Sequence, residues 1–260
     1  MKVYIHADME GISGISGSDF VLSDRPLYGL GRQYLTADVN ACIRGCLRAG
    51  ATEIIVRDGH CAGRNLLWDQ LHPAAQLYQG QSAPGVRLPL IDGAAAAIFL
   101  GYHAMAGTPA ALLEHSYSSR NIQNLWLNGE PVGEFAVDAA IAAEHGVPVV
   151  MVSGDDKVCA EARTWLPEVV CCRVKKSFGP EGCLMLSPEA AAQQIEEKTM
   201  AALAQAPTMP LRLVPGPVTM RKEMVERCRP DYAPDFRMVD GRTVETDDES
   251  VERVFCRLMW

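Results

Sequence analysis

The sequence has no long run of basic residues and no excess of positive charge. It contains 32 acidic residues against 24 lysines and arginines, which gives a formal net charge of −8 at pH 7. A surface of this charge is unfavourable for phosphate backbones and for anionic lipid headgroups. We therefore expect neither a nucleic-acid partner nor a membrane partner, and a small substrate such as a short peptide fits the composition better.

Long apolar runs are also missing. No stretch approaches the roughly 18 apolar residues that are needed to span a bilayer. The opening residues, MKVYIHADMEG, enter an expected strand directly and do not offer a secretory signal. We expect a soluble, cytoplasmic protein.

The nine cysteines, from Cys42 to Cys256, form no CxxC pair and no zinc-finger spacing. Their number is odd and their positions are scattered, with Cys228 among them. Cysteines of this kind are expected to serve as small apolar residues of the core.

What the chain does have is a regular alternation of strand-like and helix-like segments. The expected strands are short apolar or β-branched runs, and they cover residues 3–7, 52–56, 94–100 and 148–152. The expected helices cover residues 30–49, 131–144 and 187–205. This alternation is typical of βαβ units, and it predicts an α/β fold of three αβα layers around a mostly parallel sheet.

The length of 260 residues suits one large domain with a smaller appendage. The segment APTMP, residues 206–210, is the best candidate for a linker. We predict a metal-binding catalytic α/β domain over residues 1–205. A small α+β unit over residues 211–260 is predicted to follow it and to serve assembly.

Ionisable side chains follow the expected strands at the points where the strands end. Asp8 and Glu10 follow the first strand at i, i+2 spacing, so both can project from the same side of the pleat. His60 and His103 follow the second and third strands. Since the carboxyl ends of parallel strands meet in one crevice, these side chains can converge. Crowded carboxylates repel each other unless they share a proton or bind a cation.

Two more residues extend this set: Glu134 lies near the start of an expected helix, and His115 lies in an expected loop. Carboxylates and imidazoles together suit Zn²⁺, with Mn²⁺ or Co²⁺ as substitutes, and do not form a thiolate site. Three carboxylates around one divalent ion would leave the site negative, which indicates two metal ions. His6 shares the strand face of Asp8 but lies deeper, and we expect it to be a hydrogen-bonded core histidine.

Six separated segments carry a resemblance to a known family: VYIHADMEGISG, VRDGH, LGYHAMAGTP, EHSYS, LNGEPVGE and VPVVMVSGDD. In order and spacing they resemble the zinc D-aminopeptidases of the DppA type. The resemblance implies a dinuclear zinc site and a catalytic histidine, with Asp8, Glu10, His60, His103 and Glu134 as ligands and His115 in the catalytic role. It also implies a ring-shaped homo-oligomer that encloses its active sites.

The sequence therefore predicts a dinuclear metal-dependent aminopeptidase that removes the N-terminal residue, D-amino acids included, from short peptides. One alternative is a haloacid-dehalogenase-like phosphatase with Asp8 as nucleophile and Mg²⁺ bound by the segment 154–156. Its weakness is that Glu10 stands where that chemistry uses a second aspartate. The other alternative is a non-catalytic scaffold stabilised by metal, although structural zinc sites prefer cysteine-rich coordination.

Overall fold

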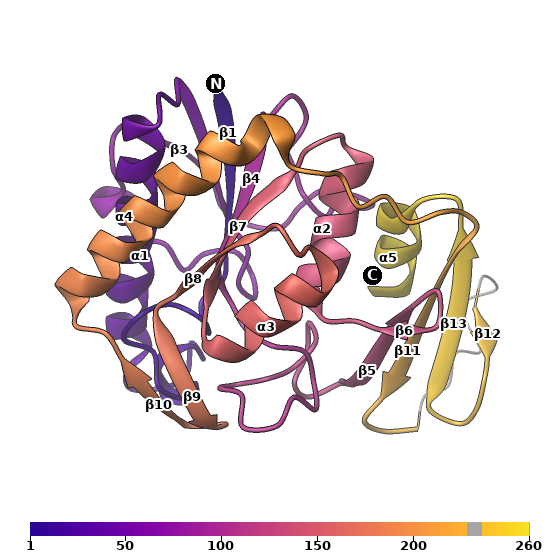
Figure 1. The fold of residues 1–260 in the computed structure, drawn as a ribbon. Coiled ribbons are helices and arrows are strands. Elements are labelled where there is room, and N and C mark those ends of the chain that lie inside the picture. Colours follow the sequence, from indigo (N-terminus) through magenta and orange to yellow (C-terminus); the bar gives the residue numbers. More distant parts are fainter. Residues whose placement is uncertain (228–235, 260) are drawn as a thin grey trace.

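A six-stranded parallel sheet forms the centre of the protein (Figure 1). The computed structural model describes residues 1–227 and 236–259. The strand order is β3-β2-β1-β4-β7-β8, and each neighbouring pair is parallel. The strands are β1 (Lys2–Ala7), β2 (Glu53–Asp58), β3 (Gln76–Tyr78), β4 (Ala96–Tyr102), β7 (Val149–Gly154) and β8 (Val170–Arg173). The α/β fold with a mostly parallel sheet is thereby confirmed.

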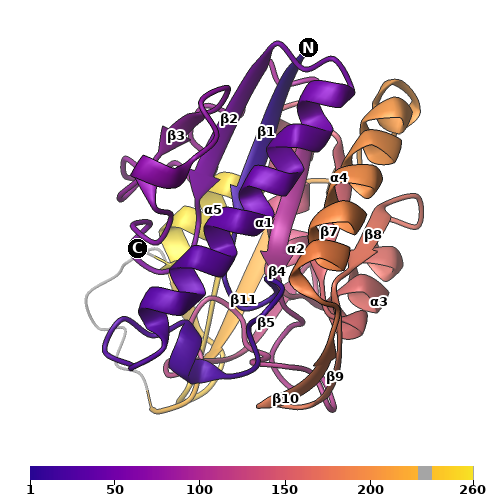
Figure 2. The same cartoon turned by 90° about the vertical axis from the view of Figure 1, so that its left-hand side faces the viewer.

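Helices cover both faces of this sheet (Figures 1 and 2). On one face, α1 (Tyr28–Arg48) packs against α4 (Pro188–Gln205). On the other face lie α2 (Glu134–Glu144) and α3 (Asp156–Trp165). Leu35, Val39 and Ile43, which recur every four positions in α1, are buried as the sequence predicts, whereas Leu47, the next in this series, is 38% exposed. Among the described residues, none of the helices combines the length and the apolar character that crossing a membrane requires.

A second sheet joins the C-terminal residues to the middle of the chain. Its order is β12-β13-β11-β5-β6, and its pairs are antiparallel. Its strands are β5 (Ile122–Leu127), β6 (Glu130–Pro131), β11 (Val218–Met224), β12 (Arg237–Met238) and β13 (Thr243–Asp248). The last helix, α5 (Val251–Met259), packs on β11 and β13 and also on α2. β5 and β6 lie within the first predicted unit, residues 1–205, so this sheet contains strands from both predicted units. The predicted division between residues 205 and 211 stays a prediction.

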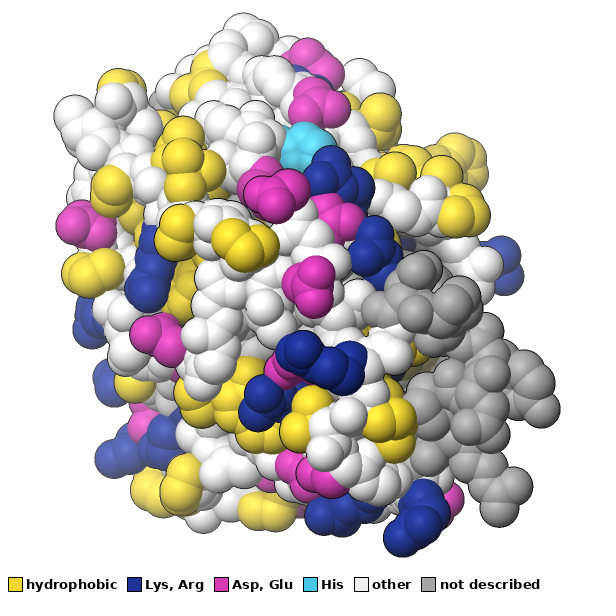
Figure 3. Space-filling view, turned by 90° about the vertical axis from the view of Figure 1, so that its right-hand side faces the viewer, with side chains coloured by type: hydrophobic (Ala, Val, Ile, Leu, Met, Phe, Trp, Pro, Cys, Tyr) yellow, Lys and Arg dark blue, Asp and Glu magenta, His cyan; other side chains and the backbone are white. Residues whose placement is uncertain are grey.

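The remaining elements are short. A hairpin of β9 (Lys175–Gly179) and β10 (Gly182–Met185) extends beyond the central sheet, and single 3₁₀ turns cover Ser18–Phe20, Trp68–Gln70 and Ala206–Thr208. Two large apolar side chains of the hairpin are exposed, Phe178 to 63% and Leu184 to 68%. On the face over the second sheet and α5, by contrast, acidic and basic side chains are interspersed with small apolar groups (Figure 3).

The cysteines behave largely as expected. Most of the eight that the structure describes are buried, and these eight form no disulfide. Cys61 is exposed and is an exception to the predicted core role. Cys228 lies outside the described residues.

The strand order places a switch point between β1 and β4, because the chain extends the sheet from β1 towards β3 and later from β4 towards β8. Ligands in such sheets bind outside the carboxyl ends of the strands at this point. The two strand ends approach so closely that only glycine fits. A Cβ atom on Gly101, whose φ is +76°, would lie 2.3 Å from the carbonyl oxygen of Asp8. The amide of Gly11 in turn donates to the Gly101 carbonyl at 2.7 Å.

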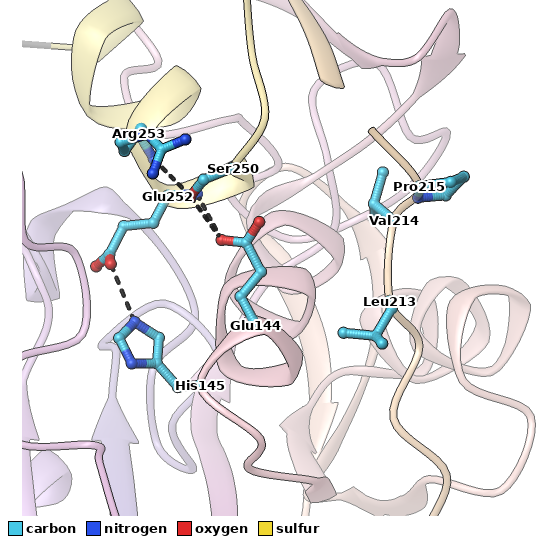
Figure 4. Close-up of a pocket in the computed structure, with 8 residues that line it drawn as sticks. All are labelled: Glu144, His145, Leu213, Val214, Pro215, Ser250, Glu252 and Arg253. Carbon is cyan, nitrogen blue, oxygen red and sulfur yellow. Dashed lines mark hydrogen bonds and ion pairs between the residues drawn. The ribbon is translucent and has the colours of Figure 1, made fainter. Parts of the chain in front are cut away.

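Two residues at the end of α2 fasten α5 in place (Figure 4). The carboxylate of Glu144 accepts hydrogen bonds from the amides of Val251 and Glu252, which are unpaired donors of the first turn of α5. The His145 ring bridges two acids, with Nε2 at 3.0 Å from Glu252 and Nδ1 at 2.7 Å from Asp92. Since α2 also begins with Glu134, these contacts fix α5 relative to a predicted metal ligand.

Replacing His145 with alanine should destabilise the protein more at pH 6 than at pH 9. Burial would lower the pKa of His145, but the Asp92 and Glu252 carboxylates outweigh it and raise this pKa above 6.5. A group whose pKa rises on folding stabilises the fold fully at pH values below its pKa in the unfolded state. This contribution is lost as the pH rises through its pKa in the folded state. Because the ring is partly exposed, we expect an effect of about 1 kcal/mol or less.

Thermal unfolding at the two pH values measures this difference. The control is Thr164→Ala, because the Thr164 hydroxyl donates a hydrogen bond to the Ala160 carbonyl and neither group ionises in this pH range. Its effect should be the same at both pH values. An equal loss at pH 6 and pH 9 for the His145 variant would show that the bridge is not ionic.

Candidate metal and catalytic site

The structure brings all six predicted site residues together at the carboxyl edge of the central sheet. Asp8 and Glu10 follow β1, His60 follows β2, His103 follows β4, His115 lies between β4 and β5, and Glu134 opens α2. The five expected ligands are buried, with 3% to 7% of their surface exposed, and His115 is half-buried. The convergence that the strand ends predict is therefore present in the fold.

One half of the site is built around His60. Its Nδ1 atom lies 3.1 Å from Oδ1 of Asp8 and 3.0 Å from Oε2 of Glu10. The other half is built around Glu134. Its Oε1 atom lies 3.1 Å from Nε2 of His103 and 3.7 Å from Nε2 of His115. Asp8 joins the halves, because its Oδ2 atom lies 3.5 Å from Nε2 of His103.

The three imidazoles share one arrangement: one ring nitrogen faces the centre and the other faces a backbone carbonyl. The outer nitrogens lie 2.9 Å from Val21 O for His60, 3.0 Å from Ala104 O for His103 and 2.8 Å from Leu113 O for His115. Donation to a carbonyl fixes the tautomer and leaves the inner nitrogen with a lone pair that can bind a metal ion. The His103 and His115 rings also stack at 3.9 Å, which restricts both orientations.

Charge pairing dominates the electrostatics of the site. Burial would lower the pKa of His103, but Glu134, Asp8 and Glu10 raise it to about 10. Burial likewise would raise the pKa of Glu10, but the nearby imidazoles, His60 first, lower it. The carboxylates thus attract protons onto the imidazoles, and a metal ion that binds here must displace those protons.

Two buried atoms of the site have no hydrogen-bond partner of suitable direction: Oε2 of Glu10 and Nε2 of His103. A polar atom left in this state costs about 1–3 kcal/mol unless a ligand satisfies it. Donor atoms also gather within 4.8 Å of one another in two groups that share His103. These groups are Asp8–Glu10–His103 and His103–His115–Glu134. Oxygen and nitrogen donors in this arrangement fit Zn²⁺.

A buried lysine that the sequence pattern does not reveal holds the loop after β1. The Nζ atom of Lys175 donates to the carbonyls of Glu10, Ile12 and Ile15 at 2.7, 2.8 and 2.9 Å. Burial lowers the pKa of Lys175 to about 8. The side chain comes from the start of β9, so only the folded chain brings it to this loop.

The sequence also does not predict the ion pair of Arg87 with Asp138, which lies next to Glu134. The Arg87 guanidinium donates to both oxygens of Asp138 at 2.8 Å, and it lies 4.0 Å from Oε2 of Glu134. Asp138 follows Glu134 by one turn of α2, and it also accepts from the Tyr117 hydroxyl at 3.1 Å. The amide of Tyr117 donates to Glu134 at 2.7 Å. Arg87, Asp138 and Tyr117 together orient Glu134.

The same cluster explains His6. Its Nδ1 atom lies 2.7 Å from the Tyr102 hydroxyl, which in turn donates to Asp138 at 2.7 Å. His6 is 2% exposed, and burial lowers its pKa to about 4. The predicted hydrogen-bonded core histidine is confirmed.

The acids that a phosphatase would use for Mg²⁺ have other partners. Asp155 caps α3 by accepting from the amides of Lys157 and Val158. Asp156 accepts from the amide of Ser177 at 2.9 Å and pairs with the Lys157 ammonium. Their side chains stabilise local structure, so the geometry does not favour this alternative.

A cavity of about 1170 Å³ lies over the site. Four of the predicted ligands and His115 line it, and the other walls include residues of β5, β11 and α5. Its size suits a short peptide. A buried cluster of carboxylates and imidazoles at the switch point of a parallel α/β sheet fits the class of metal-dependent hydrolases.

The chain belongs to the D-aminopeptidase family, whose model matches residues 1–259. It is 38% identical over 204 residues to a D-aminopeptidase of Bacillus subtilis (strain 168), which is 78% of this chain and 74% of that protein. A solved structure of the Zn-dependent D-aminopeptidase DppA from Bacillus subtilis, described as a self-compartmentalizing protease, matches with a TM-score of 0.94 at 32% identity. That match covers 100% of this chain and 96% of the other. The predicted family and the assignment to the metallopeptidases are confirmed.

Proposed function

We propose that this protein is a zinc aminopeptidase with two metal ions per chain. It removes the N-terminal residue, D-amino acids included, from short peptides. The observation that carries this proposal is the position of Asp8 between two sets of donor atoms, with His60 and Glu10 on one side and His103 and Glu134 on the other. The two oxygens of Asp8 face different imidazoles, His60 and His103, so Asp8 would help to hold both ions. Mn²⁺ or Co²⁺ could substitute for zinc.

The zinc ions, when bound, would act as Lewis acids on the scissile carbonyl and on the attacking water. The chain supplies the rest. A carboxylate oxygen that the ions leave free, such as one of Glu10, would pair with the free ammonium of the substrate, and this would select peptides with a free N-terminus. His115 carries a proton at Nε2, either taking it from water as a base or donating to the oxyanion. The hydrogen bond between its Nδ1 atom and the Leu113 carbonyl orients the ring so that Nε2 faces the site.

We further infer a ring-shaped homo-oligomer that encloses its active sites. Support comes from the similarity to a structure described as self-compartmentalizing. The exposed side chains Phe178 and Leu184 of the β9–β10 hairpin are candidates for burial by a second copy. The tip of this hairpin, at Pro180, lines the cavity, so assembly there would narrow access. The cytoplasmic location remains a prediction.

The test of function compares three substrates on the zinc-loaded protein: a D-alanyl dipeptide, an L-alanyl dipeptide and a phosphomonoester. We expect hydrolysis of the D-alanyl dipeptide. Release of phosphate alone would favour the phosphatase, and no turnover with metal retained would favour the scaffold.

Replacing His115 with alanine should lower kcat by about 10²- to 10⁴-fold, the usual contribution of a general acid or base. Metal content, measured by emission spectrometry on the same sample, should stay at two ions per chain. Loss of metal would instead make His115 a ligand, and full activity with intact metal would remove it from the mechanism.

A further inference from the structure

One side of the active-site cavity is apolar and comes from the second sheet and α5. Ile122 on β5, Met224 on β11, and Phe255 and Met259 on α5 line the cavity there, and we call these four residues the C-terminal wall. Ile122 and Met224 are cross-strand partners, next to an irregularity in the β5–β11 register. Such irregularities redirect side chains at functional sites.

A single side chain, that of Arg87, lies between the C-terminal wall and the predicted metal ligand Glu134. The centroids of the Phe255 and Tyr117 rings lie 4.8 Å apart. The Arg87 guanidinium lies 5.6 Å from the Phe255 centroid and 5.0 Å from the Tyr117 centroid. Arg87 in turn lies 4.0 Å from Glu134. A peptide whose scissile carbonyl lies at Glu134 and His115 can therefore place a neighbouring side chain against this wall.

The chemistry of the wall selects for an apolar side chain. Methionines fill irregular space and adapt to apolar groups of different shape. A cationic side chain against these four residues would lose water and would face the Arg87 guanidinium over Phe255, which is costly. The exposed arginines Arg64 and Arg120 also line the cavity and repel cationic side chains.

We propose that the C-terminal wall is the side-chain specificity subsite of the enzyme, and that it selects peptides with an apolar residue next to the scissile bond. This inference rests on the proposed peptidase function. It gives the C-terminal residues a role in substrate choice in addition to the predicted role in assembly.

Substitutions at Met224 test the subsite, because this side chain is half-buried and lies outside the catalytic residues. The substrates are dipeptides with alanine, leucine or phenylalanine at the N-terminus, in the configuration that the wild type accepts. Met224→Trp fills the subsite, so kcat/KM for the phenylalanyl substrate should fall about tenfold more than for the alanyl substrate. Met224→Ala should shift the same ratio in the opposite direction.

Met238→Trp is the matched control, because Met238 is an exposed methionine of the same sheet on β12. It should leave the substrate ratio unchanged. Met259→Trp on α5 gives a second probe of the wall if Met224→Trp unfolds, as measured by thermal melting. An unchanged ratio in the Met224→Ala and Met259→Trp proteins, or a uniform fall for all substrates, would overturn the subsite. Wild-type protein that cleaves no dipeptide would overturn the peptidase function itself.

Discussion

Replacing Glu134 with alanine should abolish peptide hydrolysis while the protein stays folded. Glu134 faces two imidazoles, His103 and His115, and its Oε1 atom also accepts from the amide of Tyr117. Loss of this carboxylate removes a predicted ligand and a charge from one half of the site. We expect kcat/KM to fall by at least 10³-fold, which corresponds to about 4 kcal/mol of transition-state stabilisation.

Metal content should fall in parallel, from two ions per chain to one or none. Glu134→Gln separates charge from shape, because the amide oxygen can still accept from Tyr117 while the negative charge is gone. Its loss of metal should approach that of the alanine variant. Glu130→Gln, at an exposed glutamate of β6, is the matched control and should keep both metal and activity.

Removal of the metal from the wild-type protein with a chelator is an independent test. Activity should disappear and return when Zn²⁺ is added, because the metal would supply the Lewis acid for hydrolysis. A Glu134→Ala protein that holds two ions and cleaves peptides at the wild-type rate would show that Glu134 is not a ligand.

Replacing Arg87 with methionine should destabilise the protein by about 3–5 kcal/mol, the cost of leaving one partner of a buried ion pair alone. Asp138 is fully buried, and Arg87 supplies two of its hydrogen bonds. Burial would lower the pKa of Arg87, but the Asp138 carboxylate at 2.8 Å outweighs this effect and raises it. Activity should fall as well, because this cluster orients Glu134 through Tyr117.

Chemical denaturation measures the stability of this variant. The double variant Arg87→Met with Asp138→Asn should recover much of the loss, because no unpaired buried charge remains. Arg64→Met is the control: this arginine lines the same cavity but is exposed, so its effect should stay within about 0.5 kcal/mol. A loss below about 1 kcal/mol for Arg87→Met would contradict the role given to the pair.

The parts of the site that the sequence predicts are those that local pattern encodes. Asp8, His60 and His103 each follow a strand that its own apolar residues define, and parallel pairing brings such ends together. Glu134 is also encoded locally, because it lies at the start of α2 and the alanine-rich composition of this segment predicts a helix. Convergence thus follows from the order of strands and helices.

The parts that the sequence does not predict depend on contacts between distant segments. Arg87 lies in residues 73–89, where no periodicity is present, and its burial depends on Asp138. Lys175 is one of two adjacent lysines, and its role depends on carbonyls at Glu10 and beyond. The pairing of β5 with β11 likewise joins the middle of the chain to its C-terminal part. Residue type and spacing carry no signal for such long-range partners.

The position of Lys175 along the chain has a consequence for biosynthesis. All predicted ligands and His115 lie within residues 8–134, so a nascent chain exposes the whole set early. The ammonium that anchors the Glu10 loop belongs to Lys175, which follows all of these residues along the chain, and Phe255 of the cavity wall follows later still. A partly translated chain therefore lacks both the anchor and one wall of the cavity.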